Sequence, residues 1–263
     1  MKSFEFHRPQ SVADAVSLLQ GNPAAKLLAG GQSLIPVMKL DLAQPEDLIS
    51  LAGIGGLKEI RDGDPLVIGA LVTHDEVANS PVVRQRIPGL AALAGGIGDT
   101  QVRNRGTLGG SLGHADPAAD YPAAVLALGA TIETDRRQIA ADDYFTGLFS
   151  TALAEDEIVT AVHFPVPERS AYAKFASPAS KYAVVGVMVA KTAGGVRVAV
   201  TGAGSHAFRV PAWESALAAS FTPDAITPGA VAAADLRSDG EASAEYRAHL
   251  VTVMARRAVQ ACQ

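Results

Sequence analysis

Two glycine-bearing segments constrain the fold of this chain more than any other feature of its sequence. They read Ala29-Gly30-Gly31-Gln32-Ser33 and Thr107-Leu108-Gly109-Gly110-Ser111, and apolar residues surround each of them. Glycine lets a backbone adopt positive φ and approach a ligand closely, while successive N–H groups and Ser or Thr hydroxyls can donate to phosphate oxygens. Taken singly, each segment fits a plain chain reversal. Together they predict two turns that close on one diphosphate, with a nucleotide as the ligand.

Neither segment has the spacing of the common nucleotide-binding motifs. The Gly-x-Gly-x-x-Gly fingerprint and the phosphate loop that ends in Gly-Lys-Ser or Gly-Lys-Thr do not match these positions. An ordinary Rossmann domain or P-loop therefore has no support here. The sequence requires a different nucleotide-binding fold.

The composition supports a folded protein with a substantial core. Of its 263 residues, 48% are hydrophobic and 19% are charged, which predicts two domains. The formal net charge is -5, and Lys and Arg form no basic stripe with interleaved aromatic residues. We therefore expect no nucleic acid and no anionic membrane surface as a partner.

The only cysteine, Cys262, lies one residue before the end of the sequence. It cannot form a disulfide or hold an iron–sulfur cluster within this chain, and a reducing cytoplasm fits best. The sequence does not open with a charged segment followed by an apolar one, and the apolar stretch 123–128 is far shorter than the ~20 residues that span a bilayer. We expect a cytoplasmic protein that is not membrane-spanning.

Local patterns predict strands that alternate with short helices up to about residue 165. Ser11 has the position of an N-cap before a helical apolar pattern that ends at Gly21. Asp62-Gly63 supplies turn chemistry between two strand-like arms within 57–70. The other expected elements are strands at 26–29, 48–51, 131–139 and 158–164, and helices that begin near Thr73 and at Pro81.

The proline-containing segment 165–170 predicts a domain boundary. We expect one domain at 1–165, with subdomains at about 1–54 and 55–165, and a second domain at 170–263.

In the second domain, β-branched runs at 184–189 and 196–201 indicate strands. Pro211 opens an expected helix that carries Trp213. A last helix from about Ala244 is expected to present one apolar face, formed by Tyr246, Leu250, Val253 and Met254.

Four longer stretches carry a family resemblance. They are KLLAGGQSLIPVMKL at 26–40, RGTLGGSLGHADPAAD at 105–120, KFASPASKYAVVGV at 174–187 and EYRAHL near the end. With them the chain resembles, nearly end to end, the FAD-binding medium subunit of molybdenum hydroxylases of the carbon monoxide dehydrogenase and xanthine dehydrogenase type. The resemblance implies an α+β fold. A two-subdomain FAD-binding domain, PCMH/vanillyl-alcohol-oxidase-like, would be followed by a small α+β C-terminal domain with an antiparallel sheet.

The resemblance also implies which residues bind FAD. One wall of a diphosphate clamp would be Lys26, Leu27, Leu28, Ala29, Gly30, Gly31, Gln32, Ser33 and Leu34, and the other Thr107, Gly109, Gly110 and Ser111. Asp120 would lie near the adenosine, where a carboxylate can accept hydrogen bonds from ribose hydroxyls. The alternative is that Asp120 only stabilises the N-terminus of a helix. The positions that would line the flavin or adenine with apolar surface are Ile97, Val102, Ile158 and Val159, although core packing also explains each.

Two residues of the C-terminal domain match positions near the flavin. Lys174 would lie by the isoalloxazine, where a positive charge stabilises the reduced ring, and Tyr182 would shield the ring from solvent. The xanthine dehydrogenase pattern has arginines and an acidic residue in the intervening loop. This chain has Pro178, Ala179, Ser180 and Lys181 there, so nicotinamide reduction is not carried over and the flavin potential is left open.

His114 follows the second glycine segment and is expected to act in the FAD site by shape or hydrogen bonding, with FAD bound non-covalently. The six histidines have no metal-ligand spacing, and no carboxylate cluster is expected around them. The sequence predicts neither a metal site nor a catalytic residue.

The function that the resemblance implies is electron transfer within a complex. A large molybdopterin subunit would hydroxylate the substrate, and a small iron–sulfur subunit with [2Fe-2S] clusters would pass single electrons to FAD on this chain for an external acceptor. A dimer of heterotrimers is the expected assembly. Two alternatives stay open: a self-sufficient FAD-dependent reductase or oxidase of the same broad fold, and a non-catalytic nucleotide-binding module.

Overall fold

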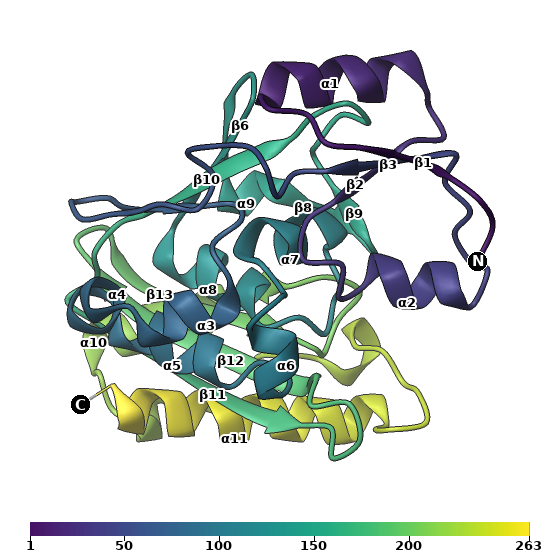
Figure 1. Ribbon diagram of the computed structural model, residues 1–263. Helices are drawn as coiled ribbons and strands as arrows, with labels where there is room; N and C mark the ends of the chain where they lie inside the picture. Colours follow the sequence, from purple (N-terminus) through teal and green to yellow (C-terminus); the bar gives the residue numbers. More distant parts are fainter. Residues whose placement is uncertain (263) are drawn as a thin grey trace.

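The computed structural model describes residues 1–262 and has an α+β fold (Figure 1). Its strands form a three-stranded, a five-stranded and a four-stranded sheet, together with one two-stranded hairpin. Among these residues, no helix has both the length and the apolar character that a membrane crossing needs.

The N-terminal sheet is parallel and delivers the chain into the first glycine segment. Its order is β1-β3-β2, with β1 (Glu5–His7), β2 (Lys26–Leu28) and β3 (Asp47–Ser50). The predicted helix is α1 (Val12–Gly21), and the Ser11 hydroxyl accepts from the Asp14 N–H as its N-cap. After the first glycine segment comes α2 (Leu34–Lys39), which the sequence patterns did not predict.

The second sheet is antiparallel and has the order β4-β5-β10-β6-β7. Its strands are β4 (Ile60–Arg61), β5 (Leu66–Gly69), β6 (Thr131–Thr134), β7 (Gln138–Ala140) and β10 (Val159–Phe164). The hairpin predicted around Asp62-Gly63 is confirmed by the pairing of β4 with β5. The single strand predicted at 131–139 is wrong, because the chain reverses there and the Thr134 N–H donates to the Arg137 carbonyl at 2.8 Å.

Short helices fill the space between this sheet and the C-terminal part. They are α3 (His74–Asn79), α4 (Pro81–Arg86), α5 (Pro88–Gly95), α6 (Thr100–Arg103), α7 (Leu108–His114), α8 (Tyr121–Leu128) and α9 (Ala141–Tyr144), and the hairpin of β8 (Phe145–Gly147) and β9 (Ser150–Thr151) follows. The helices predicted near Thr73 and Pro81 are confirmed, and Thr73 forms a capping box with Glu76.

The C-terminal sheet is antiparallel with the order β11-β12-β13-β14. Its elements are β11 (Arg169–Ala176), β12 (Ala183–Thr192), β13 (Gly195–Thr201), β14 (Phe208–Arg209), α10 (Pro211–Ala219), two 3-10 turns (Pro223–Ala225 and Ala233–Asp235) and α11 (Ala244–Ala261). Figure 1 shows α11, in yellow, lying along β11 and β12.

Both faces of this sheet are buried, against different partners. Because side chains alternate along a strand, Met188 and Ala190 of β12 join the core formed by residues 66–164, whereas Val187 and Val189 pack with α10 and α11. The C-terminal sheet therefore shares a core with the middle of the chain.

The apolar face predicted for the last helix needs one correction. Tyr246 is 45% exposed, whereas its neighbour Arg247 is fully buried. The Arg247 guanidinium donates to the carbonyls of Val184 at 2.6 Å and Gly202 at 2.8 Å, and it pairs with Asp239. A charged side chain thus occupies a core position because it satisfies strand-end carbonyls.

Candidate functional site

The two glycine segments are in direct contact. A Cβ added to Gly30 would lie 1.9 Å from the Arg105 carbonyl oxygen and 2.9 Å from the Gly106 Cα. A Cβ on Gly110 would lie 3.4 Å from the Cβ of Ala29. Glycine at position 30 is therefore required by backbone packing, and the convergence that the sequence predicted is present.

The first segment presents a row of unpaired amides. Gly31 has φ of 75°, and the N–H groups of residues 30–34 have no hydrogen-bond acceptor within residues 1–262. The segment is half-buried except for Gln32, which is exposed. Successive free N–H groups around a positive-φ residue form an anion-binding concavity, so this segment has the groups that a diphosphate needs.

The second segment begins a helix. It is the N-terminal end of α7 rather than a free turn, and Thr107 is the N-cap. Its amides are already bonded: Leu108 to Val72 O at 3.1 Å, Gly109 to Ala70 O at 2.8 Å, Gly110 to Thr107 Oγ1 at 3.1 Å and Ser111 to Thr107 O at 3.0 Å. These four amides therefore have acceptors within the chain, and the expected part of this segment in a diphosphate site stays a prediction. Its half-buried Ser111 hydroxyl has no partner among the described residues and remains available.

Asp120 and Lys174 form a buried ion pair. Asp120 Oδ1 lies 2.9 Å from Lys174 Nζ, and the two side chains are 4% and 10% exposed. The Tyr172 hydroxyl donates to the same oxygen at 2.5 Å. Burial raises the pKa of the Asp120 carboxyl, and the Lys174 ammonium and the Tyr172 hydroxyl act against that rise.

The ion pair brings together two residues that the resemblance placed near different parts of FAD. Their charged atoms are 2.9 Å apart, and the expected positions near the adenosine and the isoalloxazine stay predictions. Asp120 does hold the N-cap position of α8, the alternative interpretation, but its side chain does not cap the helix. Tyr172 was not found from the sequence, because β11 carries no local pattern that distinguishes it.

Tyr182 lies between β11 and β12 and near the first glycine segment. Burial and the Asp116 carboxylate raise the pKa of the Tyr182 phenol, and the nearby Ser33 side chain acts against that rise. The next residue, Ala183, donates its N–H to the Ala118 carbonyl at 3.1 Å. Tyr182 is 42% exposed, so part of its ring is open to a ligand.

The four expected apolar liners fall into two groups. Ile97 and Val102 are half-buried and retain some surface. Ile158 and Val159 are 1% and 7% exposed and pack in two separate cores. Core packing, the alternative interpretation, accounts for the side chains of this second group.

The other expected site residues surround the first segment or follow the second. Lys26 is exposed, and Leu27, Leu28 and Leu34 are half-buried. The half-buried His114 ring lies 5.2 Å from the ring of Phe149, centroid to centroid, at the tip of the β8–β9 hairpin. This aromatic contact was not predicted.

A buried histidine lies behind the second segment. His74 is 6% exposed, its ring lies 5.3 Å from that of Tyr121, and its Nδ1 has no partner among the described residues. Burial, with a smaller contribution from Arg103, lowers the pKa of His74 to about 4. The imidazole is therefore neutral near pH 7 and packs against Gly106.

The expectation that no carboxylates gather around a histidine is wrong at His7, whereas the expectation of no metal site stays a prediction. Glu5 and Asp47 gather around His7, with one ligand atom of each within 4.8 Å of the others. The parallel pairing of β1 with β3 brings them together. His7 Nε2 is already hydrogen-bonded to Asp47 at 2.5 Å.

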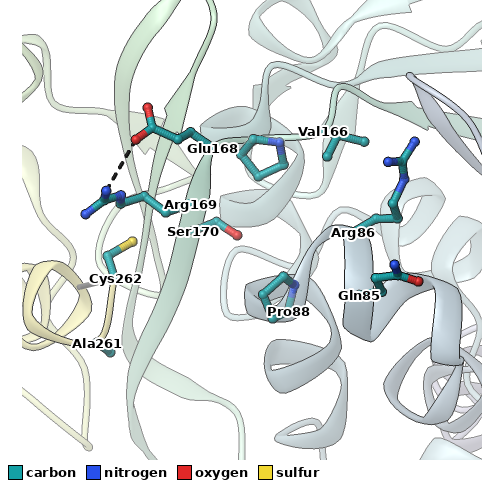
Figure 2. Close-up of a pocket in the computed structure, with 10 residues that line it drawn as sticks. Gln85, Arg86, Pro88, Val166, Glu168, Arg169, Ser170, Ala261 and Cys262 are labelled. Carbon is teal, nitrogen blue, oxygen red and sulfur yellow. Dashed lines mark hydrogen bonds and ion pairs between the residues drawn. The ribbon is translucent and has the colours of Figure 1, made fainter.

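A cavity of about 460 Å³ lies away from the glycine segments (Figure 2). The end of α4, the start of α5, the 166–170 segment and the end of α11 enclose it. Arg169 pairs there with Glu168, as Figure 2 shows, and the buried Ser170 hydroxyl lacks a partner among the described residues. The cavity contains none of the expected cofactor-binding residues.

A known protein family matches more than half of the chain. Residues 2–167 match the family described as the FAD binding domain in molybdopterin dehydrogenase. The chain belongs to this family. It is the flavoprotein component of a molybdenum-dependent oxidoreductase, of the medium-subunit type, and FAD is the cofactor of the family.

Curated relatives cover nearly the whole chain. The nicotine 6-hydroxylase medium subunit of Paenarthrobacter nicotinovorans is 40% identical over 98% of this chain and 97% of its own length. The carbon monoxide dehydrogenase medium chain of Hydrogenophaga pseudoflava is 38% identical over 98% of this chain and 96% of its own length.

Solved structures share the fold. A chain of carbon monoxide dehydrogenase from Hydrogenophaga pseudoflava superposes with a TM-score of 0.92 at 38% identity, over 99% of this chain and 97% of that one. A chain of quinoline 2-oxidoreductase from Pseudomonas putida 86 gives 0.90 at 29% identity, over 100% and 98%. The expected α+β fold and family are confirmed.

Proposed function

We propose that this chain is the FAD-carrying electron-transfer subunit of a molybdenum hydroxylase complex. It takes electrons from a [2Fe-2S] subunit and passes them to an external acceptor. The observation that carries the proposal is the row of unpaired amides at residues 30–34, which lies against the second glycine segment.

The residues present fit the cofactor. The amides of residues 30–34 hold the diphosphate, and the Ser111 hydroxyl adds a donor from the other side. Tyr182, Ile97 and Val102 supply partly exposed apolar surface for the rings. Bound FAD supplies an exchange between single electrons and electron pairs.

The partners follow from what this chain lacks. Its one cysteine is buried and cannot hold a cluster, so the [2Fe-2S] clusters belong to a small subunit and the molybdopterin to a large one. The terms medium subunit and medium chain in the relatives' names support a complex of three kinds of subunit. We propose a dimer of such heterotrimers in the cytoplasm, with non-covalent FAD.

A charge placed beside the amide row tests the binding site without disturbing the fold. Gln32→Glu adds a negative charge to an exposed side chain within the row and should weaken FAD binding by about tenfold in calorimetry of the full chain. The matched control is Gln85→Glu, at an exposed glutamine on α4, which should leave the affinity unchanged. Equal affinities of the two variants would reject the assignment.

Turnover separates the proposal from its two alternatives. The purified chain loaded with FAD should show only slow reoxidation, and sustained activity should require the two partner subunits. Steady turnover of a reduced nicotinamide by the chain alone would favour a self-sufficient reductase. A protein that binds ADP but retains no flavin would favour a nucleotide-binding module.

A further inference from the structure

The Lys174 ammonium has no donor left for a ligand. It carries three N–H groups. Nζ lies 2.9 Å from Asp120 Oδ1, and it donates to the Gly96 carbonyl at 2.8 Å and the Lys181 carbonyl at 3.2 Å. With a side chain that is 10% exposed, Lys174 is surrounded by acceptors from its own chain.

The three acceptors belong to different parts of the fold. Gly96 is the C-cap of α5, Asp120 is at the N-cap of α8, and Lys181 is in the loop between β11 and β12. Tyr172 is part of the same cluster, because its hydroxyl donates to Asp120. The hydroxyl also occupies the space beside Gly186, where an added Cβ would lie 2.1 Å from the hydroxyl oxygen. Lys174 thus ties a loop of the C-terminal sheet to two helices of the FAD-binding domain.

The tied loop carries Tyr182. Its ends are joined by the Ser177 N–H, which donates to the Tyr182 carbonyl at 2.8 Å, and the Lys181 N–H donates back to Ser177 O at 3.0 Å. Lys181 has φ of 65°, which turns its carbonyl inward to Lys174. The adjacent Tyr182 has its phenol near the Ser33 side chain of the first glycine segment.

We infer that Lys174 is a positioning residue, which with Asp120 and Tyr172 holds the 177–182 loop so that Tyr182 stays beside the first glycine segment. The inference rests on the proposed FAD site. It changes the role expected for Lys174: Tyr182 contacts the flavin, and Lys174 holds Tyr182 in position. Replacing Lys174 by a neutral residue therefore changes FAD binding indirectly, through the position of Tyr182.

A double-mutant cycle tests this route. Lys174→Met and Tyr182→Ala should each weaken FAD binding roughly tenfold, and the double variant should be within about twofold of Tyr182→Ala, because coupled residues are not additive. Bound-flavin fluorescence should rise alike in all three variants, since a stacked tyrosine quenches it. Additive losses of affinity would show that Lys174 acts on the cofactor directly and would overturn the inference.

A second variant keeps the test independent of folding defects, and a control variant shows that the effect is local. Lys174→Met leaves the buried Asp120 carboxylate unpaired and could prevent folding for that reason alone. Lys174→Met combined with Asp120→Asn leaves no unpaired buried charge, and this variant should show the same loss of FAD affinity. Lys191→Met removes a lysine paired with Glu168 at 2.8 Å on the other side of the sheet and should change nothing.

In the protein without FAD, amide exchange at Ser177 and Lys181 should become at least about tenfold faster in Lys174→Met. Unchanged exchange would overturn the inference even if the chain bound no FAD. Absence of FAD binding in the unmodified chain would instead reject the proposed function.

Discussion

The backbone at Gly30 touches the backbone at Arg105, so closely that a Cβ on Gly30 would lie 1.9 Å from the Arg105 carbonyl oxygen. This contact fixes the first glycine segment against the second before any ligand binds. The amide row at residues 30–34 is therefore held in place by packing.

Gly30→Ala should lower the free energy of unfolding by about 3 kcal/mol, because backbone atoms cannot move aside as a flexible side chain can. Urea denaturation of the protein without FAD measures the change. The control is Gly21→Ala at the end of α1, where an added Cβ meets nothing within 4 Å, and it should be neutral or stabilising by up to about 1 kcal/mol. Equal effects at the two positions would contradict the packing role.

His74 should make stability depend on pH. Its pKa is lowered from 6.5 to about 4, so the folded protein binds fewer protons than the unfolded chain between these values. Stability contributed by the neutral imidazole is present above about pH 6.5 and is lost as the pH falls toward 4, by about 3 kcal/mol in total.

His74→Gln removes this titration. The difference in unfolding free energy between the unmodified protein and the variant should shrink by about 3 kcal/mol from pH 7 to pH 4, measured by denaturation at each pH. Parallel pH profiles would show that His74 is not held neutral by burial.

Arg247→Met should destabilise the protein by about 3–5 kcal/mol, because it leaves the Val184 and Gly202 carbonyls and Asp239 without their buried partner. The matched control is Arg257→Met, at an exposed arginine of the same helix, which should change stability by no more than about 0.5 kcal/mol. Thermal denaturation compares them. A similar shift in both variants would contradict the structural role of Arg247.

Much of the fold could be predicted because local chemistry determined it. Ser11, the Asp62-Gly63 turn and Pro81 each act within a few residues, and the elements they begin or reverse are present. The 131–139 segment was misread because its turn lacks glycine and proline.

The candidate site was predicted only in part, since its contacts join distant segments. Glycine content identified both segments, but it could not show that Val72, Ala70 and Thr107 already bond the amides of the second. The Asp120–Lys174–Tyr172 cluster and the buried Arg247 likewise depend on tertiary packing, and no periodic pattern reports them.

The most direct test is a crystal structure of the full chain with FAD bound. We predict diphosphate oxygens within about 2.7–3.2 Å of the amide nitrogens of residues 30–34, with Tyr182 against the flavin and Lys174 still bonded to Asp120. A diphosphate bound elsewhere, with these amides left unpaired, would contradict the proposed site and the electron-transfer function that rests on it.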